Sequence, residues 1–127
     1  MLISMNPLKI LRALFTSASR LTPAECMDRL RSGRALLVDV RERREWSQGV
    51  AKDAALLPLS DLAGARTRWV PFLAGVAGRE ILLYCAAGGR SGIAARILAS
   101  EGFPAANTGG MDDWVAAGWP VIVPEIG

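Results

Sequence analysis

Short apolar runs that alternate with helical patterns constrain the fold of this chain more than any other feature. Residues 35–40 (Ala-Leu-Leu-Val-Asp-Val) and residues 81–84 (Ile-Leu-Leu-Tyr) are almost unbroken apolar stretches, as expected of strands buried on both faces. A third run spans residues 54–57, and charged or amphipathic segments separate the three. The pattern predicts an α/β fold with a mainly parallel central sheet and helices on both of its faces.

Capping and stop signals mark the predicted helices. Residues 22–25 (Thr-Pro-Ala-Glu) have the spacing of an N-cap, a first helical proline and a capping-box glutamate, and Gly33 follows as a stop signal. Apolar residues at helical spacing predict a helix over residues 62–73, shortened or kinked at Pro71. The other predicted elements are a helix over residues 42–48, a strand over residues 105–107 and a last helix through Trp114. A further helix is predicted to be capped by Ser91 and ended by Gly102. Its face toward the sheet is predicted to consist of Ile93, Ala94, Ile97 and Leu98.

The length of 127 residues suits one domain with one buried core. We expect an N-terminal extension over residues 1–20, the domain over residues 21–123 and a C-terminal tail over residues 124–127. Lys9 and Arg12 interrupt the apolar residues of the extension, which argues against a signal peptide. The extension is predicted to be a short amphipathic helix on the domain or a frayed terminus, and membrane contact is disfavoured.

The absence of histidine excludes several kinds of site at once. A chain without histidine cannot contain a Ser-His-Asp or Cys-His nucleophile pair, a His-ligated zinc or a His-ligated haem. Cys26 and Cys85 lie far apart with no Cys-x-x-Cys spacing, which argues against a zinc cluster or a dithiol and favours a reducing, cytoplasmic setting. The net charge of +3 comes from scattered arginines without interleaved aromatic residues, so nucleic-acid binding is not predicted.

The segment from Cys85 to Ser91 carries the strongest chemical pattern. Cys85 ends an apolar strand, and the residues Ala86, Ala87, Gly88 and Gly89 can turn backbone N–H groups inward around its sulfur. A helix beginning near Ser91 adds its positive end and Arg90 adds a full charge. Together these features predict a thiol pKa below the free value of about 8.5 and an anion-binding loop that needs no imidazole.

Other candidate residues have simpler interpretations. Cys26 lies within a predicted helix without basic neighbours at helical spacing, so a structural role is expected. Asp39 is expected to accept hydrogen bonds that hold neighbouring loops, and Arg41 to pair with Glu42 or Glu45. We therefore predict a site built from the Cys85 loop alone.

Several ordered motifs resemble those of the rhodanese homology family. The motifs lie between about Leu21 and Val123 and comprise Leu21-Thr22-Pro23, Val38-Asp39-Val40-Arg41-Glu42, Glu45-Trp46, Gly49, Pro58-Leu59, the loop Cys85 to Ser91, Gly109-Gly110-Met111-Asp112-Asp113-Trp114 and Gly118-Trp119-Pro120. The resemblance implies a small parallel sheet and a sulfurtransferase in which Cys85 carries sulfane sulfur as a persulfide. Val50, where the family often has histidine, and Ala86, where it often has arginine or glutamine, depart from the pattern.

The implied mechanism begins with attack of the Cys85 thiolate on the outer sulfur of a small anionic donor such as thiosulfate. Arg90 would orient the donor, Ser91 would cap the helix or hydrogen-bond near the sulfur, and a protein or small thiol would accept the sulfur. No metal or organic cofactor is required by this chemistry.

Two other functions stay open at this point. Cysteine phosphatases and arsenate reductases also use a thiolate in an anion-binding loop that ends in arginine, although the phosphatase loop is one residue longer than the four residues between Cys85 and Arg90. A binding module without catalysis, or one that delivers sulfur to a single partner, is the alternative from a different class.

Overall fold

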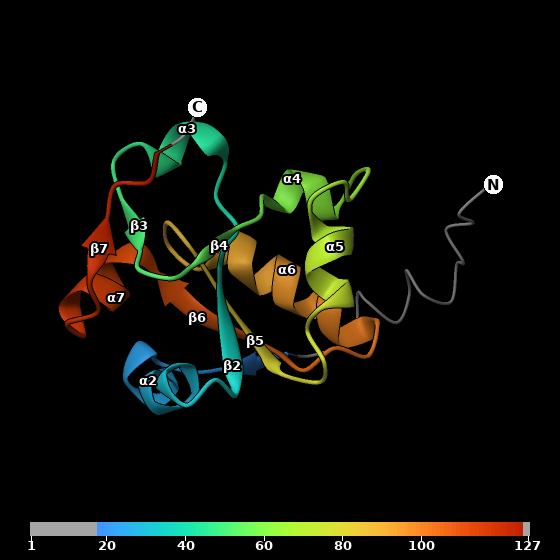
Figure 1. The fold of residues 1–127 in the computed structure, drawn as a ribbon, viewed down its shortest axis with the longest axis horizontal. Helices are drawn as coiled ribbons and strands as arrows, with labels where there is room; N and C mark the ends of the chain where they lie inside the picture. Colours follow the sequence, from blue (N-terminus) through green and yellow to red (C-terminus); the bar gives the residue numbers. More distant parts are fainter. Residues whose placement is uncertain (1–17, 126–127) are drawn as a thin grey trace.

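The computed structural model describes residues 18–125, which form a layered α/β domain around a five-stranded sheet (Figure 1). The strands lie in the order β1-β6-β5-β2-β4, and every neighbouring pair is parallel. The predicted fold class is therefore confirmed. The strands are β1 (Ser19–Arg20), β2 (Ala35–Asp39), β4 (Ala55–Leu56), β5 (Glu80–Cys85) and β6 (Ala105–Gly110).

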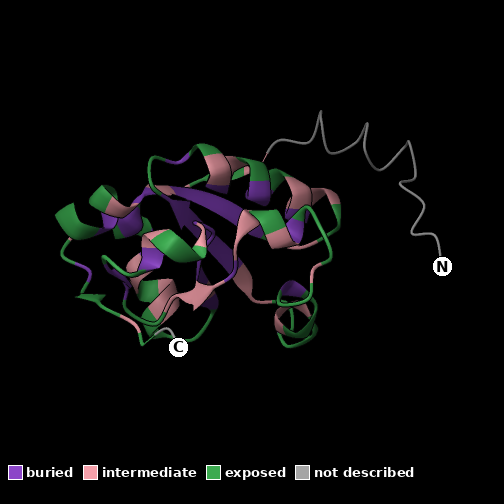
Figure 2. Ribbon diagram, turned by 90° about the horizontal axis from the view of Figure 1, so that it is seen from above, coloured by how far each residue is buried: buried purple, intermediate pink, exposed green. Residues whose placement is uncertain are grey.

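Helices cover both faces of this sheet because the central strands are apolar on both sides. In β5, Ile81, Leu83 and Cys85 belong to one core cluster, whereas Leu82 and Tyr84 belong to the other. The buried central strands lie between more exposed helices in Figure 2. The first face packs against α4 (Leu59–Leu62), α5 (Trp69–Ala74) and α6 (Gly89–Ser100), and the second against α2 (Pro23–Arg31) and α7 (Met111–Ala116).

Helix α2 begins and ends where its local sequence predicts. The Thr22 hydroxyl accepts a hydrogen bond from the Glu25 N–H, and the Glu25 carboxylate accepts one from the Thr22 N–H. This reciprocal pair satisfies two N–H groups that the helix itself leaves without partners. Gly33 follows the helix with a φ of +76°, a conformation that glycine adopts without steric cost.

The single helix predicted over residues 62–73 is wrong. Two short helices, α4 and α5, flank a turn in which Arg66 has a φ of +61°. The Asp61 carboxylate accepts hydrogen bonds from the N–H groups of Thr67, Arg68 and Trp69 and so stabilises the turn. Pro71 is the third residue of α5, where its missing N–H breaks no intrahelical bond. The break therefore arises at the turn and not at the proline.

A buried carboxylate ties together the loops beyond the carboxyl end of β2. Asp39 is fully buried and accepts hydrogen bonds from Arg41, from the Trp46 indole N–H and from the Tyr84 hydroxyl. The role predicted for Asp39 is confirmed, whereas the pairing predicted between Arg41 and Glu42 or Glu45 is wrong. Arg41 binds Asp39 instead, and its guanidinium also donates to the Gly49 carbonyl.

A second, two-stranded antiparallel sheet pairs β3 (Val50–Ala51) with β7 (Val121–Ile122), and neither strand was predicted. The short helix α3 (Arg43–Trp46) precedes β3 and occupies part of the predicted helix over residues 42–48. Strands of two residues carry too little apolar alternation to be recognised from sequence.

Two residues from the predicted N-terminal extension belong to the sheet. Ser19 and Arg20 pair with Ala106 and Asn107 to form the edge strand β1. Residues 1–17, for which a short amphipathic helix or a frayed terminus was predicted, lie outside the described residues. Within residues 18–125, no helix has the length and apolar character needed to cross a bilayer.

Candidate active site

The candidate active site lies where β5 ends and α6 begins. Cys85 is the last residue of β5 and is 1% exposed, with its side chain on the face of the sheet covered by α6. The chain turns at Gly88, whose φ of +97° suits glycine, and α6 starts at Gly89. The helix therefore begins three residues earlier than a cap at Ser91 predicts. Ser91 is its third residue and not its N-cap, which corrects that part of the prediction.

The sulfur of Cys85 is surrounded by hydrogen-bond donors. The Gly88 N–H donates to Sγ at 3.0 Å, and the Ser91 hydroxyl oxygen lies 3.4 Å from Sγ. Burial by itself raises the pKa of the thiol. Hydrogen bonds from the side chain and backbone of Ser91 and from the backbone N–H groups of Ala87 and Gly88 outweigh burial, so the pKa of Cys85 is lowered.

The Ser91 hydroxyl has one hydrogen and three competing acceptors, namely Asn107 Oδ1, the Cys85 sulfur and the Gly109 carbonyl oxygen. Its oxygen lies 2.7 Å from Asn107 Oδ1, closer than to the Cys85 sulfur. The amide orientation of Asn107 is fixed, because Oδ1 also accepts from the Gly109 N–H and Nδ2 donates to the Gly88 carbonyl. The hydroxyl therefore donates to Asn107 when Cys85 is a thiol and must turn toward the sulfur when the thiol ionises. The Gly88 N–H needs no such change, because it is already directed at the sulfur.

Asn107 is a positioning residue that sequence reasoning missed. It is buried on β6 and makes hydrogen bonds to three residues of the site region, namely Gly88, Ser91 and Gly109. The only sequence signal was a polar residue in an apolar strand that runs beside the Cys85 strand. That signal does not identify the partners, since they come from the loop and from the helix.

Gly110, on β6, supports the Cys85 loop by direct contact, and sequence reasoning missed this residue as well. A side-chain carbon at Gly110 would overlap the Ala86 carbonyl and crowd Ala87 Cα. Gly110 is also the register partner of Cys85 across the β5–β6 pair. The absence of a side chain thus lets the loop rest directly on β6. The pair Gly109-Gly110 was visible in the sequence, but its contact with the loop was not.

Arg90 lies in the first turn of α6 and forms an ion pair with α3. Its guanidinium donates to both carboxylate oxygens of Glu45, at 2.6 and 2.8 Å. The hydrogen bond from Arg90 lowers the pKa of Glu45 to about 2, so Glu45 is ionised at neutral pH. Sequence reasoning placed Arg90 at the site but did not assign it this partner.

The structure brings all seven predicted site residues into one turn. Ala86, Ala87 and Gly89 are exposed on its outer surface, Gly88 and Ser91 are buried, and Arg90 is half-buried.

In α6, Ala94 and Leu98 face the core as predicted and Ile97 packs against it, but Ile93 is 44% exposed and that prediction is wrong.

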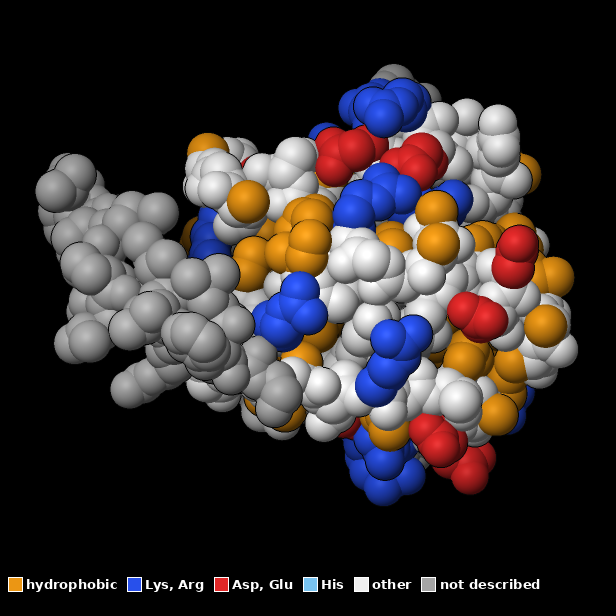
Figure 3. Space-filling model, turned by 180° about the vertical axis from the view of Figure 1, so that it is seen from behind, with side chains coloured by type: hydrophobic (Ala, Val, Ile, Leu, Met, Phe, Trp, Pro, Cys, Tyr) orange, Lys and Arg blue, Asp and Glu red, His pale blue; other side chains and the backbone are white. Residues whose placement is uncertain are grey.

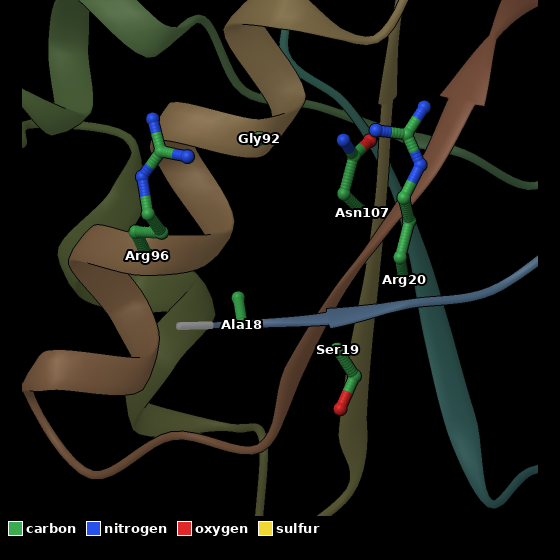
Figure 4. A pocket seen from close by; sticks show the side chains of 6 residues that line it. All are labelled: Ala18, Ser19, Arg20, Gly92, Arg96 and Asn107. Atoms are coloured by element: carbon green, nitrogen blue, oxygen red, sulfur yellow. The ribbon is translucent and has the colours of Figure 1, made fainter. Parts of the chain in front are cut away.

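Other surface features lie outside the Cys85 loop, although one of them shares Asn107 with the site. A hollow of ≈ 180 Å³ between β1 and α6 is lined by Ala18, Ser19, Arg20, Gly92, Arg96 and Asn107, and it includes no residue from 85 to 91 (Figure 4). In Figure 3, Lys and Arg side chains form separate groups on the face seen from behind. No group of three or more metal-binding side chains was found within residues 18–125.

Comparison with known proteins identifies the family. The rhodanese-like domain family matches residues 22–117, and the chain belongs to it. A sulfurtransferase from Allochromatium vinosum is 34% identical over 92 residues, which cover 71% of this chain and 80% of that protein. The structure of a human single-domain sulfurtransferase superposes with a TM-score of 0.63 and 28% identity, covering 78% of this chain and 96% of that one.

A third similar structure carries a different description. A protein of unknown function from Rhodopseudomonas palustris, described as a possible tyrosine phosphatase, has a TM-score of 0.68 and 25% identity. The match covers 90% of this chain and 91% of that chain. Both enzymatic alternatives considered for the Cys85 loop are thus represented among the similar proteins.

Proposed function

We propose that this protein is a sulfurtransferase that carries sulfane sulfur as a persulfide on Cys85. The observation that carries the proposal is the environment of the Cys85 sulfur. A buried thiol receives a hydrogen bond from Gly88 at the start of α6, lies beside Ser91 and has a lowered pKa. Membership of the rhodanese-like family and the similar sulfurtransferases support the same activity.

The proposed reaction uses the thiolate as the nucleophile. It attacks the outer sulfur of the donor, the S–S bond of the donor breaks, and the electron pair leaves with the rest of the donor. With thiosulfate the leaving group is sulfite. The persulfide on Cys85 then passes its outer sulfur to a nucleophilic acceptor and regenerates the thiolate. We expect the N–H groups that stabilise the thiolate to stabilise the persulfide anion as well.

We propose a small anionic sulfur donor and a protein or small-thiol acceptor in a reducing compartment such as the cytoplasm. Cys26 and Cys85 are both free thiols, which supports the choice of compartment. Neither a metal nor an organic cofactor is needed for the transfer. Exposure of Ala86, Ala87 and Gly89 gives an acceptor a surface to contact beside the sulfur.

A phosphatase is a weaker candidate for this site. Its tetrahedral oxyanion needs a ring of N–H donors around the whole group, and the four residues between Cys85 and Arg90 make a loop that is one residue shorter than the phosphatase pattern. Arg90 is held by both oxygens of Glu45, so its donors face a carboxylate of the chain itself. A binding module without catalysis would not require the lowered pKa of Cys85.

The experiment that tests the proposal is intact-mass measurement after incubation of the reduced protein with thiosulfate or with methanethiosulfonate. We expect a gain of one sulfur atom that is removed by cyanide, which accepts sulfane sulfur. Cys85→Ser should lose the gain completely. Cys26→Ala is the matched control and should retain it, because Cys26 lies in a core cluster on the other face of the sheet.

Two results would contradict the proposal. Failure of both donors to load folded wild-type protein would favour the binding module. Hydrolysis of an aryl phosphate that disappears in Cys85→Ser would favour the phosphatase.

A further inference from the structure

The charge balance around Cys85 has a consequence for the choice of sulfur donor. Arg90 is the only cationic residue in the loop from 85 to 91, and it is close enough to Cys85 for the two charges to attract each other. Its guanidinium is nevertheless bound by two hydrogen bonds to Glu45, which is ionised at neutral pH. The positive charge that would attract an anionic donor is therefore already compensated.

Neighbouring groups add negative charge. Glu42 also attracts Arg90, and the Glu42 N–H donates to Glu45, which fixes that carboxylate at the start of α3. Arg41 also attracts Glu45, but its guanidinium is bound to the buried carboxylate of Asp39, so it offsets only part of these negative charges. When Cys85 is a thiolate, the single positive charge of Arg90 is thus close to three negative groups, namely the thiolate, Glu45 and Glu42.

We propose that Glu45 is a specificity-determining residue that makes Cys85 prefer donors with at most one negative charge over the dianion thiosulfate. A dianionic donor must either displace Glu45 from Arg90 or enter a region of net negative charge, and both events cost free energy. A donor with one charge or none escapes most of this penalty. The inference rests on the proposed sulfur transfer to Cys85 and identifies the class of donor that the site accepts.

Thiosulfate and methanethiosulfonate form a matched pair of donors for this question. Replacing one charged oxygen of thiosulfate by a methyl group gives methanethiosulfonate, a monoanion of similar size. In both reactions the Cys85 thiolate attacks the outer sulfur and the donor S–S bond breaks. The electron pair leaves with sulfite in one case and with methanesulfinate in the other. Dividing each rate by the rate with a free small thiol removes the intrinsic difference between the two donors.

The test compares both donors with the wild type and with Glu45→Gln, and follows thiocyanate formation in the presence of cyanide. Glutamine keeps the size of the side chain and an oxygen that can accept from the Glu42 N–H. We expect the wild type to prefer methanethiosulfonate by roughly tenfold after normalisation. In Glu45→Gln, kcat/KM for thiosulfate should rise by roughly tenfold, while kcat/KM for methanethiosulfonate should change little.

Glu101→Gln is the matched control. Glu101 binds Arg66 through both carboxylate oxygens at 2.7 Å, with side-chain exposure close to that of the Arg90–Glu45 pair. Glu101 directly follows α6, at the end of the helix opposite Gly89. Its replacement by glutamine therefore removes an equal charge far from the sulfur. The donor preference should stay at the wild-type value in this variant. Circular dichroism verifies that both variants fold.

Salt dependence gives a second measurement that needs no variant. If negative charge repels thiosulfate, the wild-type rate with this donor should increase with ionic strength, because salt screens like charges. A rate that falls with salt would overturn the inference, as would a donor preference that is the same in Glu45→Gln and the wild type. Absence of sulfur transfer from either donor to wild-type Cys85 would overturn the proposed function itself.

Discussion

The two cysteines of this protein are equally buried but chemically opposite. Cys85 is 1% exposed and Cys26 is 0% exposed, and both are free thiols. The pKa of Cys85 is lowered, whereas burial raises the pKa of Cys26 to about 11. Burial disfavours both thiolates, so it cannot explain the difference.

Hydrogen-bond donors explain it. Cys26 lies inside α2, where the backbone N–H groups are used within the helix, and it packs against the second core cluster. The prediction that Cys26 has no basic neighbour at helical spacing is wrong, because Arg29 lies three residues further along α2 and attracts the thiolate. Arg29 is, however, paired with Glu80. Cys85 lies where a strand ends and a helix begins, and there the N–H groups are free to turn toward sulfur. The reactivity of these two thiols thus depends more on the backbone N–H groups available at each position in the chain than on the extent of burial.

The largest expected effect is the difference in alkylation rate between the two thiols. At neutral pH, iodoacetamide should modify Cys85 on the order of 100-fold faster than Cys26, because only thiolates react and Cys26 has almost none. Peptide mapping by mass spectrometry measures both rates in one sample. The pH midpoint of the Cys85 rate should lie below that of free cysteine. A midpoint at or above the free value would break the comparison.

Gly110→Ala should disturb Cys85 and leave Cys26 as it is. The added methyl group would overlap the Ala86 carbonyl, so the loop must move away from β6 and its N–H groups must lose their alignment with the sulfur. We expect a loss of about 2 kcal/mol in the free energy of unfolding, typical of overpacking, and slower alkylation of Cys85. Urea denaturation and peptide mapping measure the two effects.

The control for this substitution is Gly75→Ala. A side-chain carbon at Gly75 would make only an ordinary contact, 3.7 Å from the Phe72 carbonyl oxygen. Its Cys85 alkylation rate should match that of the wild type. Unchanged Cys85 reactivity in Gly110→Ala would show that the loop does not depend on its support from β6.

Ser91→Ala separates the side-chain donor from the backbone donors. The pKa of Cys85 should rise, and alkylation at neutral pH should slow by roughly fivefold. The effect is moderate because the Ser91 hydroxyl must leave Asn107 to reach the thiolate, whereas Gly88 is already directed at the sulfur. Ser100→Ala, in the last turn of the same helix, is the control. Complete loss of Cys85 reactivity in folded Ser91→Ala would show instead that the Ser91 side chain, and not the backbone N–H groups, stabilises the Cys85 thiolate.

The smallest effect concerns the acid stability of the Cys85 region. The pKa of Glu45 is about 2 in the folded protein and about 4.3 in an unfolded chain. A lowered folded-state pKa contributes stability that is present above about pH 4.3 and is lost as the pH falls toward 2. Glu45→Gln should therefore be less stable than the wild type at pH 7, by roughly 1 kcal/mol, and nearly equal to it near pH 2. Urea denaturation at both pH values measures this, and a constant difference would contradict it.

The amino-acid sequence by itself determined the local features of this protein. The apolar runs predicted the strands β2 and β5, because a strand buried on both faces is apolar at nearly every position. Thr22 and Glu25 predicted the start of α2, since the capping box lies within four consecutive residues. Cys85 was placed at a strand end by its immediate neighbours. Each of these predictions depends on residues close together in the chain.

Tertiary structure decided which distant residues meet at the sulfur. Asn107 and Gly110 come from β6 and Glu45 comes from α3, and each meets the Cys85 loop only because the parallel sheet brings these segments to one edge. Arg41 is a different case, because its partner Asp39 is only two residues away and is distinguished from the neighbouring glutamates by its complete burial. Side-chain partners are chosen by distance and burial in the folded protein, and neither quantity is encoded in the spacing of residues along the chain.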